Sequence, residues 1–203
     1  MLGALAVPLS TPDGWEILSY TRIPPNEVRF GDDGLEIHVR RSASPVVYAL
    51  PSPVVVTRVR ASGRVNGTLA LPDGATQGKS GADDYVLRVG LVESGDRRLG
   101  RLQRLGAAAW VKRLFSLAPP GEGISRVHFL NVAQHTSHIG AVRSHPLNDI
   151  LFEHVVSAFG EDARFVVDHQ LDRPTRVPAI WLSSDGDDTA STFSVTLERL
   201  ILE

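Results

Sequence analysis

The sequence predicts a mostly β protein: an antiparallel β-sandwich of jelly-roll or galactose-binding type, with one or two short helices. Two observations carry this prediction. Apolar and polar residues alternate along many short segments, as is typical of strands with one face in water. Turn residues (Gly, Pro, Asp and Asn) separate those segments. The alternation is clearest near the C-terminus, where Phe193, Val195 and Leu197 fall on one side of a predicted strand.

The bulk composition fits one domain spanning residues 1–203. A chain of 203 residues, 42% hydrophobic and 22% charged, is long enough to build one sandwich core. The net charge of −2 gives no general attraction to nucleic acid, so no nucleic-acid partner is expected. Cysteine is absent, which excludes disulfides, thiolate metal sites and cysteine nucleophiles. These numbers leave the oligomeric state open.

The N-terminus leaves the compartment open as well. Its first residues, MLGALAVPLS, are apolar but lack a basic region and are short for a signal peptide. If they are the end of a trimmed export signal, the protein is exported or periplasmic; if they are the native start, it is cytoplasmic. No run approaches the ~20 apolar residues of a membrane helix, so no transmembrane segment is expected.

Strands are predicted at intervals along the whole chain. The clearest hairpin joins residues 28–30 and 35–41, because a Gly-Asp-Asp-Gly turn separates two short apolar segments. A short strand over residues 46–50 ends at Pro51 and Pro53. The remaining strand candidates are residues 15–23, 54–65, 84–92, 125–133 and 164–168.

Arginines occupy one face of the longest predicted strand. Arg58, Arg60 and Arg64 project together, and three guanidinium groups in a row can grip an anionic ligand. The alternative is a solvated surface with partners on neighbouring strands. Arg58 and Arg60, with Arg88 from a later strand, are the candidate ligand-binding arginines. Trp181 joins them as a candidate platform for sugar stacking; its alternative is a place in the core.

Residues 97–117 predict a helical insertion between strands. Leucine and alanine recur there at three- to five-residue intervals, which is close to helical spacing. Six basic residues and no acidic one also permit contact with a membrane surface or with phosphates. Gly100 and Gly106 weaken the helix. We therefore interpret the segment as a short helix that caps one end of the sandwich.

A second helix is predicted over residues 144–160. Ser144 is a candidate cap, Pro146 is an early proline and Gly160 is a stop signal. The apolar face of this helix consists of Leu147, Ile150, Leu151, Val155 and Phe159.

Three histidines precede or begin that segment. His135, His138 and His145 are spaced as metal ligands can be. They have no clear carboxylate partner and the segment reads as a loop, whereas a tight site needs a rigid frame. We therefore assign them no ligand role.

Carboxylates cluster in two loops: Asp83 and Asp84 in one, and Asp185, Asp187 and Asp188 in the other. Aspartates spaced around a small residue commonly bind Ca²⁺, so these five are the candidate metal ligands and Ca²⁺ is the candidate cofactor. The second loop lacks the Gly and terminal Glu of an EF-hand. Two alternatives stay open: paired carboxylates act as acid and base in glycosidases, and aspartates cap turns.

Four motifs occur in a characteristic order: Ser42-Ala43-Ser44, Lys79-x-Gly81-x-Asp83-Asp84 running into Arg88-Val89, Phe159-Gly160, and Asp185-x-Asp187-x-Thr189. In this order, from about residue 15 to residue 202, the chain resembles a bacterial family known only as a domain of unknown function. The resemblance implies a jelly-roll-like sandwich, often found in exported proteins, with no established activity. It also draws attention to the two aspartate loops.

These patterns favour a non-catalytic binding module for carbohydrate or another polar ligand, with an anionic small molecule among the candidate partners and Ca²⁺ as a candidate cofactor. One alternative is a glycan-active enzyme, a hydrolase or a lyase, which uses the loop aspartates while Arg58, Arg60 or Arg88 steers an acidic sugar. Another is a structural or partner-binding protein. The first prediction depends mainly on the fold, and a fold hosts many functions.

Overall fold

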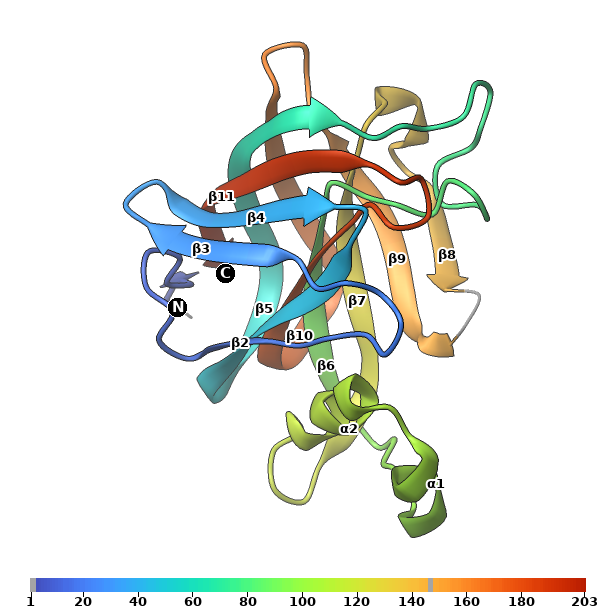
Figure 1. Ribbon diagram of the computed structural model, residues 1–203. Helices are drawn as coiled ribbons and strands as arrows, with labels where there is room; N and C mark the ends of the chain where they lie inside the picture. Colours follow the sequence, from blue (N-terminus) through green and yellow to red (C-terminus); the bar gives the residue numbers. More distant parts are fainter. Residues whose placement is uncertain (1–2, 146–147) are drawn as a thin grey trace.

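The computed structural model describes residues 3–145 and 148–203, and strands make up most of its regular structure (Figure 1). The strands are β1 (Leu5–Ala6), β2 (Trp15–Ile17), β3 (Glu27–Gly31), β4 (Gly34–Arg40), β5 (Ala43–Thr68), β6 (Leu87–Gly95), β7 (Gly123–Ala133), β8 (Val142–His145), β9 (Asn148–Ala158), β10 (Arg164–Asp185) and β11 (Thr192–Leu202). The helices are α1 (Arg101–Gly106) and α2 (Ala109–Ser116), with a 3₁₀ turn at Thr136–His138. The predicted fold class, a mostly β sandwich with short helices, is confirmed.

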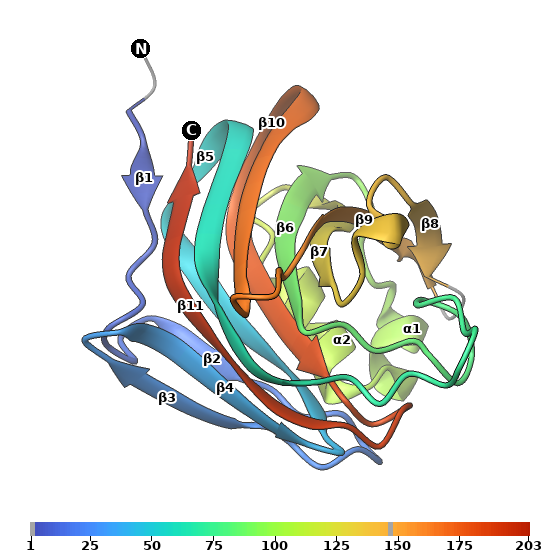
Figure 2. The ribbon, with the colours of Figure 1, turned by 90° about the horizontal axis from the view of Figure 1, so that it is seen from above.

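The strands pair in the order β3-β4-β11-β5-β10-β6-β7-β9-β8, with β1 on β11 and β2 on β5. The long strands β5 and β10 run antiparallel side by side, and Figure 2 shows them curving together. Their register shifts between Gln170 and Thr175 and again between Val177 and Ala179. Such irregularities bend a strand, so each long strand contributes to two layers.

The pairing defines these layers. The first layer contains β3, β4, β11, the C-terminal half of β5 and the N-terminal half of β10. The second contains β2, the other halves of β5 and β10, and then β6, β7, β9 and β8. Only β7 and β9 pair in parallel among the described strands.

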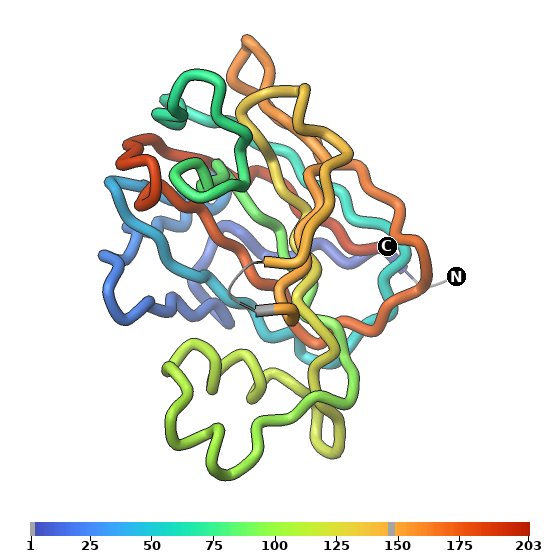
Figure 3. The backbone as a smooth tube through the Cα atoms, turned by 90° about the vertical axis from the view of Figure 1, so that its right-hand side faces the viewer, coloured from blue at the N-terminus to red at the C-terminus, as the bar shows by residue number. Residues whose placement is uncertain are grey.

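Alternation along the strands builds two main cores. Val46 belongs to the cluster between the layers, whereas its neighbour Val47 belongs to a second cluster on the outer face of the second layer. Likewise, Ile180 belongs to the cluster between the layers and Trp181 to the cluster on the outer face. The second cluster is completed by Leu114 of α2, so α2 covers part of this outer face. Figures 1 and 3 place the two helices at one end of the molecule.

The helix predicted over residues 144–160 is wrong, because this stretch forms β8 and β9. β9 lies between β7 and β8 and has apolar residues on both faces: Ile150 and Val155 are buried on one, and Val156, like Phe159 just after the strand, is half-buried against the core between the layers. A strand covered on both sides gives a nearly continuous apolar run, which imitates helical spacing. Pro146 and Leu147, assigned to that helix, lie outside the described residues.

The segment 97–117 forms two helices instead of one. α1 ends at Gly106, where the sequence already weakened the helix. Leu114 of α2 is fully buried, but Leu102 and Leu105 of α1 are 84% and 80% exposed. The apolar spacing therefore predicted a single buried face that only α2 possesses. Neither helix is long and apolar enough to cross a membrane, and no other helix in the described ranges is.

Several strand boundaries also differ from prediction, and the strand expected over residues 164–168 continues to Asp185 as β10. The first strand is limited to Trp15–Ile17 instead of residues 15–23. The two strands expected at residues 46–50 and 54–65 are halves of β5, because Pro51 and Pro53 bend the strand without ending it. The predicted hairpin is confirmed as β3 and β4.

Candidate functional site

The candidate site lies on the outer face of the second layer. Register places Trp181 of β10 beside Gly90 of β6, then Phe129 of β7, Glu153 of β9 and Arg143 of β8. Strand geometry puts all five on one face, since directly paired residues point to the same side. Gly90 is required here because an added Cβ would lie 2.7 Å from the Phe129 ring and from the Trp181 carbonyl oxygen.

A neighbouring row on the same face is polar and contains one buried charge. Register aligns Ser183 of β10, Arg88 of β6 and Asn131 of β7. Arg88 is only 5% exposed. Its guanidinium forms an ion pair with Asp185 and lies 3.3 Å from a carboxylate oxygen of Glu153.

Arg88 is held from two further sides. One guanidinium nitrogen donates to the backbone carbonyl of Asp83 at 2.9 Å, and a carboxylate oxygen of Asp83 lies 3.7 Å away. The guanidinium carbon also lies 4.7 Å from the centre of the Tyr85 ring, a cation–π distance. Arg88 thus connects three carboxylates from three separate segments.

Arg143 of β8 brings a second positive charge to the same carboxylates. Its guanidinium donates to the carboxylates of Asp83 and Glu153 and to the carbonyl of Gly78. His145, two residues later, has its Nε2 3.8 Å from a carboxylate oxygen of Asp83. We call these six residues the charge cluster: Asp83, Arg88, Arg143, His145, Glu153 and Asp185.

The environment shifts the pKa values of the charge cluster in opposite directions. Burial raises the pKa of Asp83 more than the nearby Arg88 and Arg143 lower it. Burial acts on Glu153 too, but Arg88 and Arg143 outweigh it and lower the pKa of that carboxyl. Burial lowers the pKa of His145. The cluster therefore holds carboxyl groups with different proton affinities side by side.

Three members of the cluster could hold a metal ion. Asp83, His145 and Glu153 each offer one ligand atom, and these atoms lie within 4.8 Å of one another. The donor set is one nitrogen and two oxygens, whereas Ca²⁺ prefers six to eight oxygens. Arg143 already occupies both carboxylates, and its charge opposes a bound cation.

The structure brings the two aspartate loops together. Asp84 is fully buried, and its carboxylate accepts hydrogen bonds from the backbone N–H of Thr189 at 2.7 Å and from its hydroxyl at 2.6 Å. The backbone N–H of Asp188 donates to Asp84 at 3.3 Å, and the N–H of Asp83 donates to Asp188 at 2.8 Å. Asp84 and Asp188 thus fasten one loop to the other, as turn-capping aspartates do.

The remaining two loop aspartates differ from each other. Asp185 accepts from the Ser183 hydroxyl at 2.5 Å and pairs with Arg88. Asp187 has its pKa raised by burial and by the nearby Asp84. The calcium role of all five aspartates stays a prediction.

Aromatic residues continue the outer face beyond the charge cluster. Trp110 of α2 stands between Tyr20 and Trp181, with ring centres 5.7 Å and 6.2 Å away, both in edge-on geometry. Trp181 is 2% exposed, so it forms the floor, while Tyr20 and Trp110 are half-buried. Burial raises the pKa of Tyr20 to about 12, and the Tyr20 hydroxyl is hydrogen-bonded to the Ser183 side chain.

The exposed arginines predicted as ligand residues lie elsewhere. Arg58 contacts Asp168 of β10 at 2.5 Å, and Arg60 lies 3.3 Å from Glu203. Arg64 pairs with Glu198 of β11 at 2.6 Å. These partners come from neighbouring strands, as in the alternative that the sequence left open. Of the predicted ligand residues, only Arg88 and Trp181 belong to the outer face described above.

Sequence reasoning missed Glu153 and Arg143. Both lay in or beside a segment interpreted as helix or loop, where a single charge carried no signal. Once the segment is assigned as strands, Glu153 is an acidic residue in the middle of a buried strand. Such a residue needs a charged partner, and this requirement is the signal that could have found it.

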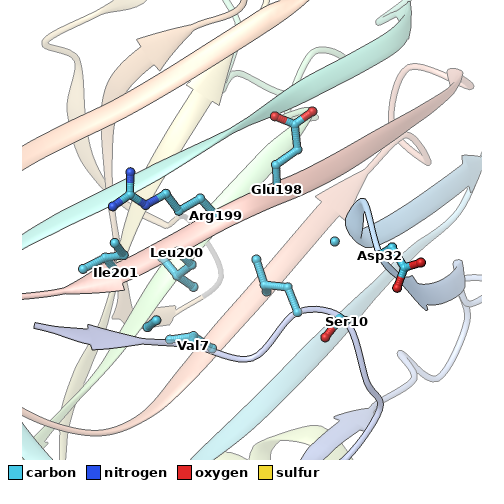
Figure 4. Close-up of a pocket in the computed structure, with 10 residues that line it drawn as sticks. Val7, Ser10, Asp32, Glu198, Arg199, Leu200 and Ile201 are labelled. Carbon is cyan, nitrogen blue, oxygen red and sulfur yellow. The ribbon is translucent and has the colours of Figure 1, made fainter.

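A shallow cavity of about 360 Å³ lies apart from this face, where β1 meets β11 (Figure 4). Its lining comes from β11, from Ala6 of β1 and the residues that follow it, and from the turn between β3 and β4, and it includes the charged side chains of Asp32, Glu198 and Arg199. It contains no member of the charge cluster, and we assign it no role.

Fold and site together define a β-sandwich protein with a charged and aromatic face on one layer. No protein-family model and no curated protein sequence matches the chain. A solved xylan-binding module, CBM15, aligns with 99% of this chain and 95% of its own, at 7% identity and a TM-score of 0.40. An apo Crh5 transglycosylase aligns with 98% of this chain and 83% of its own, at 10% identity and a TM-score of 0.34.

At these TM-scores neither alignment carries an argument about function. The resemblance to one bacterial family is supported only as far as the sandwich fold, since no family model matches.

Proposed function

We propose that this protein is a carbohydrate-binding module whose ligand lies over Tyr20 and Trp110 and reaches the charge cluster. The observation that carries the proposal is the junction of two half-buried aromatic rings with a group of fixed charges on one sheet face. Sugars present apolar C–H faces to aromatic rings and hydroxyl groups to charged acceptors and donors. An aromatic surface with a few oriented polar groups meets both needs.

The partly exposed members of the charge cluster would make the polar contacts. Asp83, Arg143 and His145 are half-buried, whereas Arg88 and Glu153 lie beneath them. The cluster contains two arginines and three carboxylates, so its formal charge is −1 when His145 is neutral. A neutral glycan therefore fits this surface better than an acidic one.

Titration of neutral and acidic oligosaccharides by calorimetry tests the proposal. We expect Trp110→Ala and Tyr20→Leu each to weaken binding of a neutral glycan about tenfold or more. Trp15→Ala is the matched control, because Trp15 is also half-buried but lies beside Phe30 and Tyr48 instead. Equal loss in all three variants, or no binding by the unaltered protein, would contradict the proposal.

Calcium assistance needs a separate test, because Asp84 and Asp188 are occupied by hydrogen bonds and Asp83 by Arg143. A calcium ion at Asp83 must displace a guanidinium group. We expect EDTA and then millimolar Ca²⁺ to leave the melting temperature unchanged. A rise with Ca²⁺ that Asp187→Ala abolishes would restore the five-aspartate site predicted from the sequence.

A glycan-active enzyme is the second candidate, and one observation favours it. One carboxylate oxygen of Asp83 lies within 4.8 Å of one of Glu153, and Asp83 is half-buried. Two neighbouring carboxyl groups are also what retaining glycosidases use, at a separation of about 5–5.5 Å. Both are held by Arg143, which disfavours a free nucleophile. A screen for new reducing ends or unsaturated products distinguishes the two functions: a binding module leaves the glycan intact.

A further inference from the structure

Three histidines gather at a place that neither the sequence motifs nor the proposed carbohydrate surface uses. They are His128 of β7, His154 of β9 and His169 of β10, and we call them the histidine cluster. Their ring centres are separated by 4.9 Å between His154 and His169, 6.3 Å between His128 and His169, and 6.4 Å between His128 and His154. Such proximity of three imidazoles is the first requirement of a shared metal ion.

The cluster lies at the edge of the sandwich, between its layers. His128 continues the alternation of Leu130 on β7, which belongs to the core between the layers, and His169 continues that of Val167 on β10. His128 and His154 come from the second layer and His169 from the first. A cavity of about 330 Å³ adjoins the cluster; it is lined by Arg126, His128, Leu171, Asp172, Arg173 and Thr175.

The two ring nitrogens of His128 have different surroundings. Nδ1 lies 3.6 Å from a carboxylate oxygen of Glu93, which itself lies 3.1 Å from Arg126. Nε2 is buried and has no hydrogen-bond partner among the described residues, and His128 is only 7% exposed. A histidine that binds a metal usually has its other nitrogen oriented by a carboxylate. A buried nitrogen without a partner is costly unless something binds it.

We propose that the histidine cluster binds a divalent transition-metal ion of the Zn²⁺ class through His128 Nε2 and one ring nitrogen each of His154 and His169. Imidazoles that share an ion with bonds of ~2.0–2.1 Å have ring centres about 5 Å apart. One of the three observed separations already has this value.

Binding requires a side-chain rotation. The rings of His128 and His154 are nearly parallel, with an interplanar angle of 2°, so His154 must turn for both to face one ion. His154 and His169 are half-buried, which leaves them room to turn and gives an ion a path inward. The adjoining cavity leaves space for water or another ligand in a fourth position.

The bound ion would join the two layers at the edge where β9 and β10 face each other without backbone pairing. It would therefore be structural in effect whatever occupies its fourth position. Ca²⁺ is not expected to replace it, because imidazole nitrogen is a poor ligand for that ion.

Zinc titration of the tag-free, EDTA-treated protein tests the site. We expect one equivalent of Zn²⁺ to bind with a dissociation constant below about 1 μM and to raise the melting temperature. The double substitution His154→Gln with His169→Gln should abolish both effects. Because both residues are half-buried, its melting temperature in EDTA should stay near that of the unaltered protein.

Two control variants identify the binding site. His135→Gln with His138→Gln removes another close pair, with ring centres 6.2 Å apart. His145→Gln removes the nitrogen ligand of the charge cluster. Both controls should retain the zinc equivalent. Retention by the histidine-cluster variant, loss in either control, or no binding by the unaltered protein at 100 μM Zn²⁺ would overturn the proposal.

Discussion

Two groups of arginines in this molecule are paired with carboxylates, but in opposite surroundings. Arg58, Arg60 and Arg64 form a row on β5, and Arg58 exposes 36% of its side chain. Arg88 and Arg143 lie in the charge cluster, and the Arg88 side chain is 6% exposed. Every guanidinium in both groups has a carboxylate within 4.0 Å.

The contrast shows that burial, not the number of ion pairs, decides what each group does. An exposed ion pair replaces contacts with water by a contact with its partner, so it adds little to the stability of the fold. A buried charge cannot return to water, so removal of its partner leaves an uncompensated charge. The exposed row therefore belongs to the sheet surface, whereas the charge cluster fixes loops and strands around one face.

The largest effect is expected for Arg88→Met. The substitution removes the guanidinium that pairs with Asp185 and one of the two guanidinium groups beside Glu153, so two buried carboxylates lose compensating charge, and we expect the free energy of unfolding to fall by about 3–5 kcal/mol. Urea denaturation measures this difference. Arg60→Met is the control, because Arg60 also lies near more than one carboxylate, Asp168 and Glu203, but its side chain is 41% exposed. Equal losses in the two variants would contradict the role assigned to burial.

A smaller effect is expected for Asp84→Ala. Its carboxylate accepts three hydrogen bonds from Asp188 and Thr189, which hold the loop after β10. Loss of these bonds should destabilise the fold by about 1–3 kcal/mol and increase hydrogen exchange at the amides of both donors. Asp187→Ala is the control, since Asp187 makes none of these contacts. An unchanged exchange rate at Thr189 would disprove this capping role.

The sequence predicted the sandwich but could not predict which charges meet. The alternation of apolar and polar residues in β4 and β11 is visible in the sequence, because one face of each strand is more exposed to solvent than the other. β9 has apolar residues on both faces, and its pattern therefore predicted a helix. Arg88 and Trp181 were selected as site residues, but their partner Glu153 was hidden in that wrong element.

The histidine cluster could not be predicted from the sequence for a related reason. His128, His154 and His169 are far apart in sequence, and no spacing rule connects them. They meet because β7 and β9 pair in parallel while β10 passes from one layer to the other. Contacts that depend on strand order need the topology, whereas contacts within one loop do not.

Tyr20 affects the alkaline limit of the protein's stability. The pKa of Tyr20 is raised to about 12 in the folded protein, first by burial, while an unfolded tyrosine titrates near pH 10. The folded state therefore holds this proton more tightly. The contribution of Tyr20 to the free energy of unfolding is complete below pH 10 and is lost as the pH rises through 12. Tyr20→Phe should flatten this part of the stability curve, as followed by urea denaturation from pH 8 to pH 11.

The smallest effect is expected where the sequence placed its arginine ligands. Arg58→Ala removes a bidentate pair with Asp168, yet both side chains are exposed, with relative exposures of 36% and 45%. Water and salt compensate the loss, so urea denaturation should detect no change in stability at physiological salt. If Arg58 instead binds a ligand, as the sequence predicted, Arg58→Ala will weaken glycan binding without any change in stability. That result would move the binding surface from the outer face of the second layer to β5.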